Sequence, residues 1–427
     1  MTSLVTLLIP DRRIRAAARR TGGALRVALL SGALALPPVV GLSAQATPTA
    51  PAAPAKPTVE YGDRGVVFNG TDGFSYLILR FRVQQLAQLT TVSDDDFEIA
   101  TANLAVRRMR LRLESVLWDQ RLKVNVQLSF TRGDQDFEAS NFPNVLRDAY
   151  VTWQATKRLA LVGGQGKLPG NRQRVNSSSE LQFADRSIVN GAFTLDRDVG
   201  VFAHYTNMDA ALPFILRGAV TSGEGRNPAV GSNGLAYTGR MELLPFGAFT
   251  GGGDYFEGDL RREPKPKLSI AAGLMHNDRA IRTGGQLGRP LYAPRSFTTY
   301  LADVLYKHRG LALSAEIARR NAPNPFTVSG ADTRYVLTGD GVTVQASYVL
   351  KSDIEPAMRF SLVSPNAELA GRSGADRQRQ ISIGLTKYLK GHKVKVQGEL
   401  LHDDYRNAAT FARRGTWGVR TSMEVGI

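Results

Sequence analysis

Cysteine is absent from the 427-residue chain, and only five histidines and three tryptophans occur. Without cysteine the chain can form neither a disulfide framework nor a thiolate metal site, and the few histidines leave little for metal coordination. No run inside the chain approaches the roughly 20 apolar residues that a membrane-spanning helix needs. We therefore expect no disulfide-rich domain, no membrane helices, no metal site and no bound cofactor.

The first 46 residues have the order of a secretory signal peptide. Six arginines within residues 12–26 precede an apolar stretch at 27–42 and a small-residue, A-x-A-like sequence at 43–46. We expect export with cleavage near Ala44 or Ala46, followed by a Pro/Ala-rich periplasmic tether at residues 47–60. The signal holds six of the 54 Lys and Arg but only one of the 38 Asp and Glu, so the exported part remains basic.

Two-residue alternation of apolar and polar side chains dominates the remainder, residues 61–427, which form one predicted domain. From Leu122 to Thr131 the alternation is unbroken for ten residues, with valines and leucines on one face and Lys, Asn, Gln, Ser and Thr on the other. About 16 such segments predict strands: 74–85, 102–114, 122–131, 148–154, 159–166, 199–205, 213–221, 235–244, 268–276, 297–307, 311–319, 342–350, 358–363, 380–387, 393–401 and 417–425.

The length and spacing of these segments favour a transmembrane antiparallel β-barrel. Segments of about 10 residues suit strands tilted across a bilayer, and an even number of strands is usual in bacterial barrels. Short connections at 118–120, 156–157 and 391–392 are interspersed with long polar ones at 131–146, 167–197, 277–296, 320–340 and 402–415. The alternative is a secreted all-β sandwich or solenoid, in which the apolar faces would form a buried core.

Arginines on one strand indicate which face points to the lumen. Arg108, Arg110 and Arg112 share a face with Glu114, and Met109, Leu111 and Leu113 share the other. Turning the arginines toward lipid would cost about 2–4 kcal/mol each at the bilayer midplane. We therefore expect all three to line the lumen.

The same reasoning extends the cationic surface to neighbouring strands. Arg80 and Arg82 on the first strand and Lys123 on the third alternate with apolar residues and should also point inward. Arg107 lies on the opposite face and is expected near the rim of the barrel. If the strand registers align, the inward-facing side chains form a band of positive charge that would favour anions in a narrow pore.

Five motifs then resemble the phosphate-selective porin O and P family in order and spacing. They lie at Val106–Glu114, Asp148–Val151, Val162–Pro169, Phe183–Asn190 and Asp196–Val201. The resemblance implies a sixteen-stranded barrel in the bacterial outer membrane, usually a homotrimer, with a long third loop folded into the pore and basic side chains guiding anions. The chain departs from the family pattern at Gly166 and Gly170, where aromatic residues are usual, and at its last residue, Ile427, where Phe is common.

Residues 167–197 correspond to that third loop and are the predicted constriction. The first half of the segment is cationic and is followed by three consecutive serines at 177–179. The alternative is an external loop that is merely solvated. The candidate constriction residues are Lys167, Arg172, Arg174, Arg186 and Arg197.

Passive diffusion of small anions, with phosphate among the candidates, is the predicted function, and no catalytic activity is expected. The alternative is a barrel with a plugged lumen that serves a structural, adhesive or hydrolytic role, for which His204 and His276 would be the available bases. Nucleic-acid binding is not expected, because the arginines are spread along amphipathic strands without interleaved aromatic residues.

Overall fold

The computed structural model describes residues 56–135, 137, 143–228 and 231–427. The predicted signal peptide and residues 47–55 of the predicted tether lie outside the described residues. The tether's predicted end at residue 60 is wrong, because strand β1 (Thr58–Gly62) begins inside it and pairs with β2 (Gly65–Asn69). The hairpin forms because Val59 and Tyr61 introduce the same alternation that marks the later strands.

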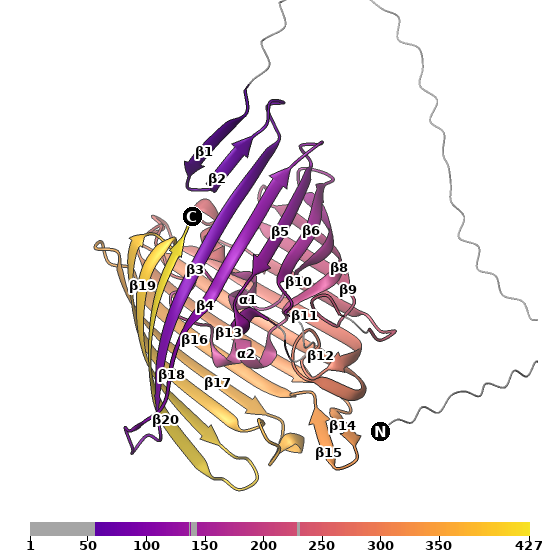
Figure 1. Ribbon diagram of the computed structural model, residues 1–427, viewed down its shortest axis with the longest axis vertical. Helices are drawn as coiled ribbons and strands as arrows, with labels where there is room; N and C mark the ends of the chain where they lie inside the picture. The colour runs from indigo at the N-terminus through magenta and orange to yellow at the C-terminus, as the bar shows by residue number, and fades with distance from the viewer. Residues whose placement is uncertain (1–55, 136, 138–142, 229–230) are drawn as a thin grey trace, which may run out of the picture. The chain divides into compact units, whose positions relative to one another are not determined.

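Sixteen further strands form a closed antiparallel barrel, as predicted (Figure 1). Each strand pairs with its neighbours, and β3 pairs with β20 to close the sheet. The sixteen segments expected from the sequence all coincide with strands. The barrel strands are β3 (Tyr76–Thr91), β4 (Ile99–Val116), β5 (Leu122–Ser129), β6 (Leu146–Gln154), β7 (Leu159–Lys167), β8 (Arg197–Asn207), β9 (Phe214–Thr221), β10 (Ala236–Leu243), β11 (Lys267–Arg282), β12 (Pro290–His308), β13 (Leu311–Asn321), β16 (Gly339–Tyr348), β17 (Ile354–Pro365), β18 (Arg377–Lys390), β19 (Val394–Arg406) and β20 (Arg413–Gly426).

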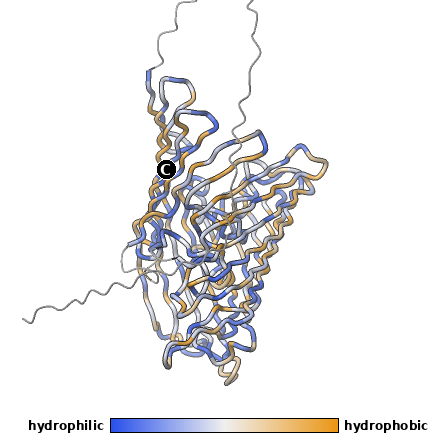
Figure 2. The backbone as a smooth tube through the Cα atoms, turned by 90° about the vertical axis from the view of Figure 1, so that its right-hand side faces the viewer, coloured by the Kyte–Doolittle hydropathy of each residue, from blue (hydrophilic) through white to orange (hydrophobic). Residues whose placement is uncertain are grey.

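The barrel is apolar outside and polar inside. On β18, Ile383 and Leu385 are 58% and 55% exposed, whereas Ser382 before them and Thr386 after them are buried. Figure 2 shows the same alternation of apolar and polar residues along the other strands. This inverted arrangement is typical of a barrel in a membrane and excludes the sandwich, which would bury its apolar faces.

The two ends of the barrel differ in their connections. One end has short turns, such as 117–121, 155–158, 309–310 and 391–393, and the other has longer loops, including 168–196 and the loop that holds the hairpin β14 (Phe326–Ser329) and β15 (Asp332–Tyr335). Two predicted long loops, 277–296 and 402–415, are wrong: the actual loops are only 283–289 and 407–412. Strands continue there through polar residues, whose backbone pairing does not depend on hydropathy.

The connection between β10 and β11, residues 244–266, is an exception that the alternation did not predict. It lies at the end with short turns but contains 23 residues and the 3-10 helix η2 (Thr250–Tyr255). The remaining helices are short: η1 (Arg132–Asp134), α1 (Arg172–Val175), α2 (Ile188–Phe193) and η3 (Ala367–Leu369). None of the helices in the described part of the chain is long and apolar enough to cross a membrane.

Residues 168–196 contain α1 and α2, and α2 contacts β13, β16 and β17. A side chain at Gly341 of β16 would collide with Val189 and Phe193, and one at Gly384 of β18 would collide with Phe183. These glycines therefore give the segment room to approach the strands closely. Ser187 caps α2 by accepting a hydrogen bond from the backbone N–H of Asn190.

Candidate functional site

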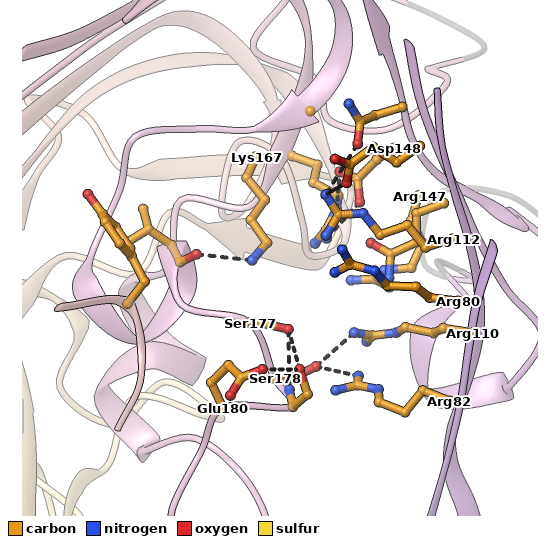
Figure 3. A pocket seen from close by; sticks show the side chains of 18 of the residues that line it. Arg80, Arg82, Arg110, Arg112, Arg147, Asp148, Lys167, Ser177, Ser178 and Glu180 are labelled. Carbon is orange, nitrogen blue, oxygen red and sulfur yellow. Dashed lines mark hydrogen bonds and ion pairs between the residues drawn. The ribbon is translucent and has the colours of Figure 1, made fainter. Parts of the chain in front are cut away.

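A cavity of about 830 Å³ lies inside the barrel, bounded mainly by β3–β8 and by residues 166–186. Residues 255–256 and 392–393 also contribute to its wall. Figure 3 shows part of the lining. Its charged lining comprises eleven basic and five acidic side chains: Arg80, Arg82, Arg110, Arg112, Arg147, Lys167, Arg174, Arg186, Arg197, Arg217 and Lys393, against Asp63, Glu114, Asp148, Glu180 and Glu424.

The arginines of β3 and β4 lie side by side because the two strands pair in register. Arg80 is directly opposite Arg112, and Arg82 is directly opposite Arg110. Figure 3 shows these four side chains projecting from the barrel wall into the cavity. The structure thus brings together the inward-facing arginines that alternation suggested on adjacent strands.

Carboxylates from distant parts of the chain offset much of this charge. Glu424 of β20 lies 3.0 Å from Nη1 of Arg82. Asp134 accepts hydrogen bonds from Nε and Nη2 of Arg110, at 2.6 and 2.7 Å. The sequence contained no signal for these partners, because each is far from its arginine along the chain and lies in or near a different connection.

Arg108 lies deeper in the wall than the other arginines and does not line the cavity. Its Nη2 donates to Asp185 at 2.7 Å, and its guanidinium also bonds Gln84. Burial alone would raise the pKa of Asp185, but attraction to Arg108 and Arg107 outweighs burial, and the pKa lies below its ordinary range. Asp185 is therefore ionised at neutral pH, and Arg108 holds residues 168–196 to β4.

Arg107 does not lie on the face opposite Arg108, contrary to the expectation from strict alternation. A bulge interrupts the register between Gln84 and Gln85 of β3, so that Arg107 has no partner opposite it on that strand. A bulge turns the extra residue away from the face that alternation would give it. Arg107 donates through Nε and Nη2 to Asp185, at 3.0 and 2.8 Å, beside Arg108.

Ser178 joins the arginine row to the predicted constriction segment. Its Oγ accepts hydrogen bonds from Nη2 of Arg82 and Nη1 of Arg110, both at 2.7 Å (Figure 3). Because the hydroxyl accepts twice, its own proton is left to donate. Sequence reasoning anticipated the serines as donors but not their contact with these arginines.

Lys167 and Arg186 face the cavity without a carboxylate partner among the described residues. Lys167 Nζ donates to the carbonyls of Val175 and Asn176, at 3.2 and 3.1 Å. Arg186 donates to the carbonyls of Gln173 and Asn176, at 2.5 and 3.1 Å, and burial lowers its pKa to about 9. Both side chains are held by neutral acceptors.

The other three predicted constriction residues are anchored by ion pairs. Arg172 is buried away from the cavity and bonds Glu242 and Asp303, at 3.1 and 2.6 Å. Arg174 pairs with Asp196, and Arg197 pairs with Asp148 at 2.8 Å. Lys167 and Arg197 are the last residue of β7 and the first of β8, so the connection itself spans 168–196 rather than 167–197.

Three further predicted pathway residues are not fully buried. Arg112 lies 3.2 Å from Glu114 and keeps 42% of its side chain exposed. Arg80 donates through Nε to the carbonyl of Arg64, at 2.8 Å, and has no carboxylate partner in the described chain. Lys123 is exposed near the short-turn end of β5 and is not part of the cavity lining.

The structure does not bring together the residues of the hydrolytic alternative. His204 lines the cavity, whereas His276 is exposed and its Nδ1 lies 3.0 Å from Thr298 Oγ1. Among the described residues no cluster of three His, Asp or Glu side chains could hold a metal ion.

The comparisons with known proteins agree with this architecture. Residues 80–250 match the sequence profile of the family described as phosphate-selective porin O and P. A curated relative, an uncharacterized protein of Aquifex aeolicus (strain VF5), is 23% identical over 337 residues, which are 68% of this chain and 73% of that protein.

Three solved structures resemble the chain in fold alone. OmpF of Salmonella typhi, solved with daunomycin, has a TM-score of 0.52 at 13% identity and covers 83% of this chain and 98% of its own. The outer-membrane channel DcaP of Acinetobacter baumannii has a TM-score of 0.51 at 12% identity, over 83% and 99%. The anion-selective porin of Comamonas acidovorans has a TM-score of 0.50 at 13% identity, over 83% and 100%.

Family and fold lead to one conclusion. The motifs singled out in the sequence fall largely inside the matched residues, and the barrel has the strand number, apolar exterior and polar interior of a membrane porin. The predicted family is therefore confirmed over residues 80–250, and the chain is a porin of the bacterial outer membrane related to the phosphate-selective porin O and P family.

Proposed function

We propose that the chain is a passive channel for small anions and that residues 168–196 form its constriction. The observation that carries this proposal is the cavity lining, in which basic side chains outnumber acidic ones by more than two to one. Three further acids, Asp134, Asp196 and Glu242, pair with lining cations from behind the wall. Counting them still leaves the basic side chains in excess.

Electrostatics inside a narrow pore make this excess effective. Screening by salt and water is weak in a low-dielectric channel, so a cluster of Arg and Lys favours anions. Arg80, Lys167 and Arg186 contribute most, because no carboxylate pairs with them in the described part of the chain. Solutes would move along these side chains without covalent chemistry, and no enzymatic activity is proposed.

Preference for phosphate is the finer part of the proposal. Guanidinium groups present forked donors that match phosphate, and the hydroxyl of Ser178 adds a neutral donor between Arg82 and Arg110. Their existing bonds to Glu424 and Asp134 keep the arginines from holding an anion too tightly, which suits release. Assembly as a homotrimer in outer-membrane lipid is proposed from the family.

Ion conductance in planar bilayers tests the proposal. In a salt gradient the wild-type channel should give a reversal potential on the anion-selective side, and added phosphate should reduce the chloride current. A cation-selective or unselective channel would overturn the anion preference, and undiminished chloride current would overturn the phosphate preference. Absence of conductance would instead favour a plugged barrel with a structural or adhesive role.

A further inference from the structure

Residues 244–266 are buried more deeply than a connection at the short-turn end should be. Glu257, Asp259 and Glu263 are only 7%, 1% and 1% exposed. Carboxylates in a solvated turn would remain in water, because burying them is costly unless they are bonded. The segment therefore folds against other parts of the protein, and its contacts identify them.

Lys307 of β12 holds the backbone of this segment against the inner face of the barrel. The side chain is buried, and its Nζ donates to the carbonyls of Gly253 and Phe256, at 2.7 and 2.8 Å, and to that of Gly258. An ammonium group has three N–H donors, so all of them are used on one short stretch of chain.

Glu257 connects the segment to residues 168–196. Its Oε1 accepts from Nε2 of Gln173 at 3.3 Å, and its Oε2 accepts from the backbone N–H of Gln182 at 3.0 Å. Its own N–H donates to the carbonyl of Glu180 at 2.8 Å. Nε2 of Gln345, on β16, also donates to Oε2 at 3.2 Å. One residue thus bonds both ends of the stretch 173–182 and the barrel wall.

The same segment also supplies part of the cavity wall. Tyr255 and Phe256 line the cavity, and the hydroxyl of Tyr255 is fixed by Arg217 and by Glu242, at 3.0 Å from the latter. Residues 173–182, which Glu257 holds in place, include Ser178, which contacts Arg82 and Arg110. A movement of Glu257 would therefore change the width of the path on two sides.

We propose that residues 244–266 form a second pore-lining segment, which enters the lumen from the short-turn end, and that Glu257 is the positioning residue that fixes the constriction. The inference rests on the chain being a channel and is independent of which ions the channel prefers. Without Glu257, the donors of Gln173, Gln182 and Gln345 lose their shared acceptor, and residues 173–182 are free to shift.

Single-channel recording of Glu257→Ala tests the proposal. We expect a higher mean conductance and a noisier open current than in the wild type. Heat-modified gel mobility should show that the barrel of the variant is still folded. Glu263→Ala is the matched control: Glu263 is at least as deeply buried, but among the described residues its carboxylate bonds only Thr250, which belongs to the same segment. The proposal would be overturned if Glu257→Ala kept the conductance and noise of the wild type. It would also be overturned if Glu263→Ala showed the same change as Glu257→Ala.

A reversible cross-link provides a second test that does not depend on stability. The chain has no cysteine, so Gln173→Cys with Glu257→Cys introduces the only two thiols, at side chains whose ends approach to 3.3 Å. We expect the reduced variant to be noisy and a short bifunctional thiol reagent to restore a quiet, smaller conductance. Unchanged noise after linking would overturn the positioning role. A wild-type protein that forms no channel would instead refute the proposed function.

Discussion

The two halves of the barrel use inward-facing charges differently. Along β3–β8 the charged side chains border an open cavity, and several remain partly exposed. Along β10–β13 and β16–β19 the inward-facing charges are covered by residues 168–196 and 244–266 and are paired within the protein. The same alternation of polar and apolar residues thus produces a pore wall in one half and an anchoring surface in the other.

Buried ion pairs carry the anchoring in the covered half. Asp303 of β12 bonds Arg172 of α1 at 2.6 Å and Arg240 of β10 at 2.7 Å. Arg359 of β17 bonds Glu399 at 3.1 Å and lies 4.3 Å from the ring centre of Phe183. Such groups stabilise a fixed arrangement because losing one partner leaves an unpaired buried charge. Residues 168–196 are therefore held on their covered side, and only their other side is left to present charge to the cavity.

The largest expected effect is on stability in the covered half. Asp303→Ala removes one of the two carboxylates that Arg172 and Arg240 share, the other being Glu242, and should lower the free energy of unfolding by about 3–5 kcal/mol. Urea denaturation in lipid vesicles measures this change. Asp340→Ala is the matched control, because the Arg319–Asp340 pair is mostly exposed and is worth at most about 1 kcal/mol. Equal losses in the two variants would contradict the comparison of the two halves.

A large effect on selectivity is expected in the cavity half. Arg80→Glu together with Arg112→Glu reverses two partly exposed charges in the row opposite the constriction segment. A tenfold salt gradient gives a perfectly selective pore a reversal potential of about 59 mV. In the double variant the reversal potential should move toward cation selectivity by a sizeable part of that value. Lys123→Glu, on neighbouring β5 but outside the cavity lining, should move it much less. A larger shift for Lys123→Glu would place the selective region elsewhere.

The smallest expected effect is a dependence of selectivity on pH. Burial raises the pKa of Glu180, a carboxyl on the cavity wall. As the pH falls from neutral, Glu180 should take up a proton before exposed carboxyls do, and the loss of one negative charge should increase anion selectivity. Reversal potentials recorded between pH 7 and pH 5 measure this change. In Glu180→Gln the change over that range should disappear; if it persists, another group is responsible.

Prediction from the sequence succeeded for the strands and for the facing of Arg110 and Arg112, whereas Arg108 is buried against Asp185 and does not line the cavity. It failed at Arg107, because a bulge adds a residue to one strand without any mark in the hydropathy. It also failed to find residues 244–266, since Lys307 and Glu257 give no local sign that they hold a connection inside the barrel. Contacts between buried polar groups that are far apart in the chain leave no periodic pattern in the sequence, so they cannot be predicted from it.

The sequence by itself determined the barrel and the inward direction of its arginines, because period-two alternation is local and lipid penalises every guanidinium that faces it. Only the tertiary structure decided which arginines keep their charge available to a solute. Asp134, Asp185 and Glu424 reach their partners from distant parts of the chain, whereas Arg80, Lys167 and Arg186 receive only carbonyl oxygens. Coulombic attraction depends on distance in space, and the closed barrel with its inward-folded connections sets that distance.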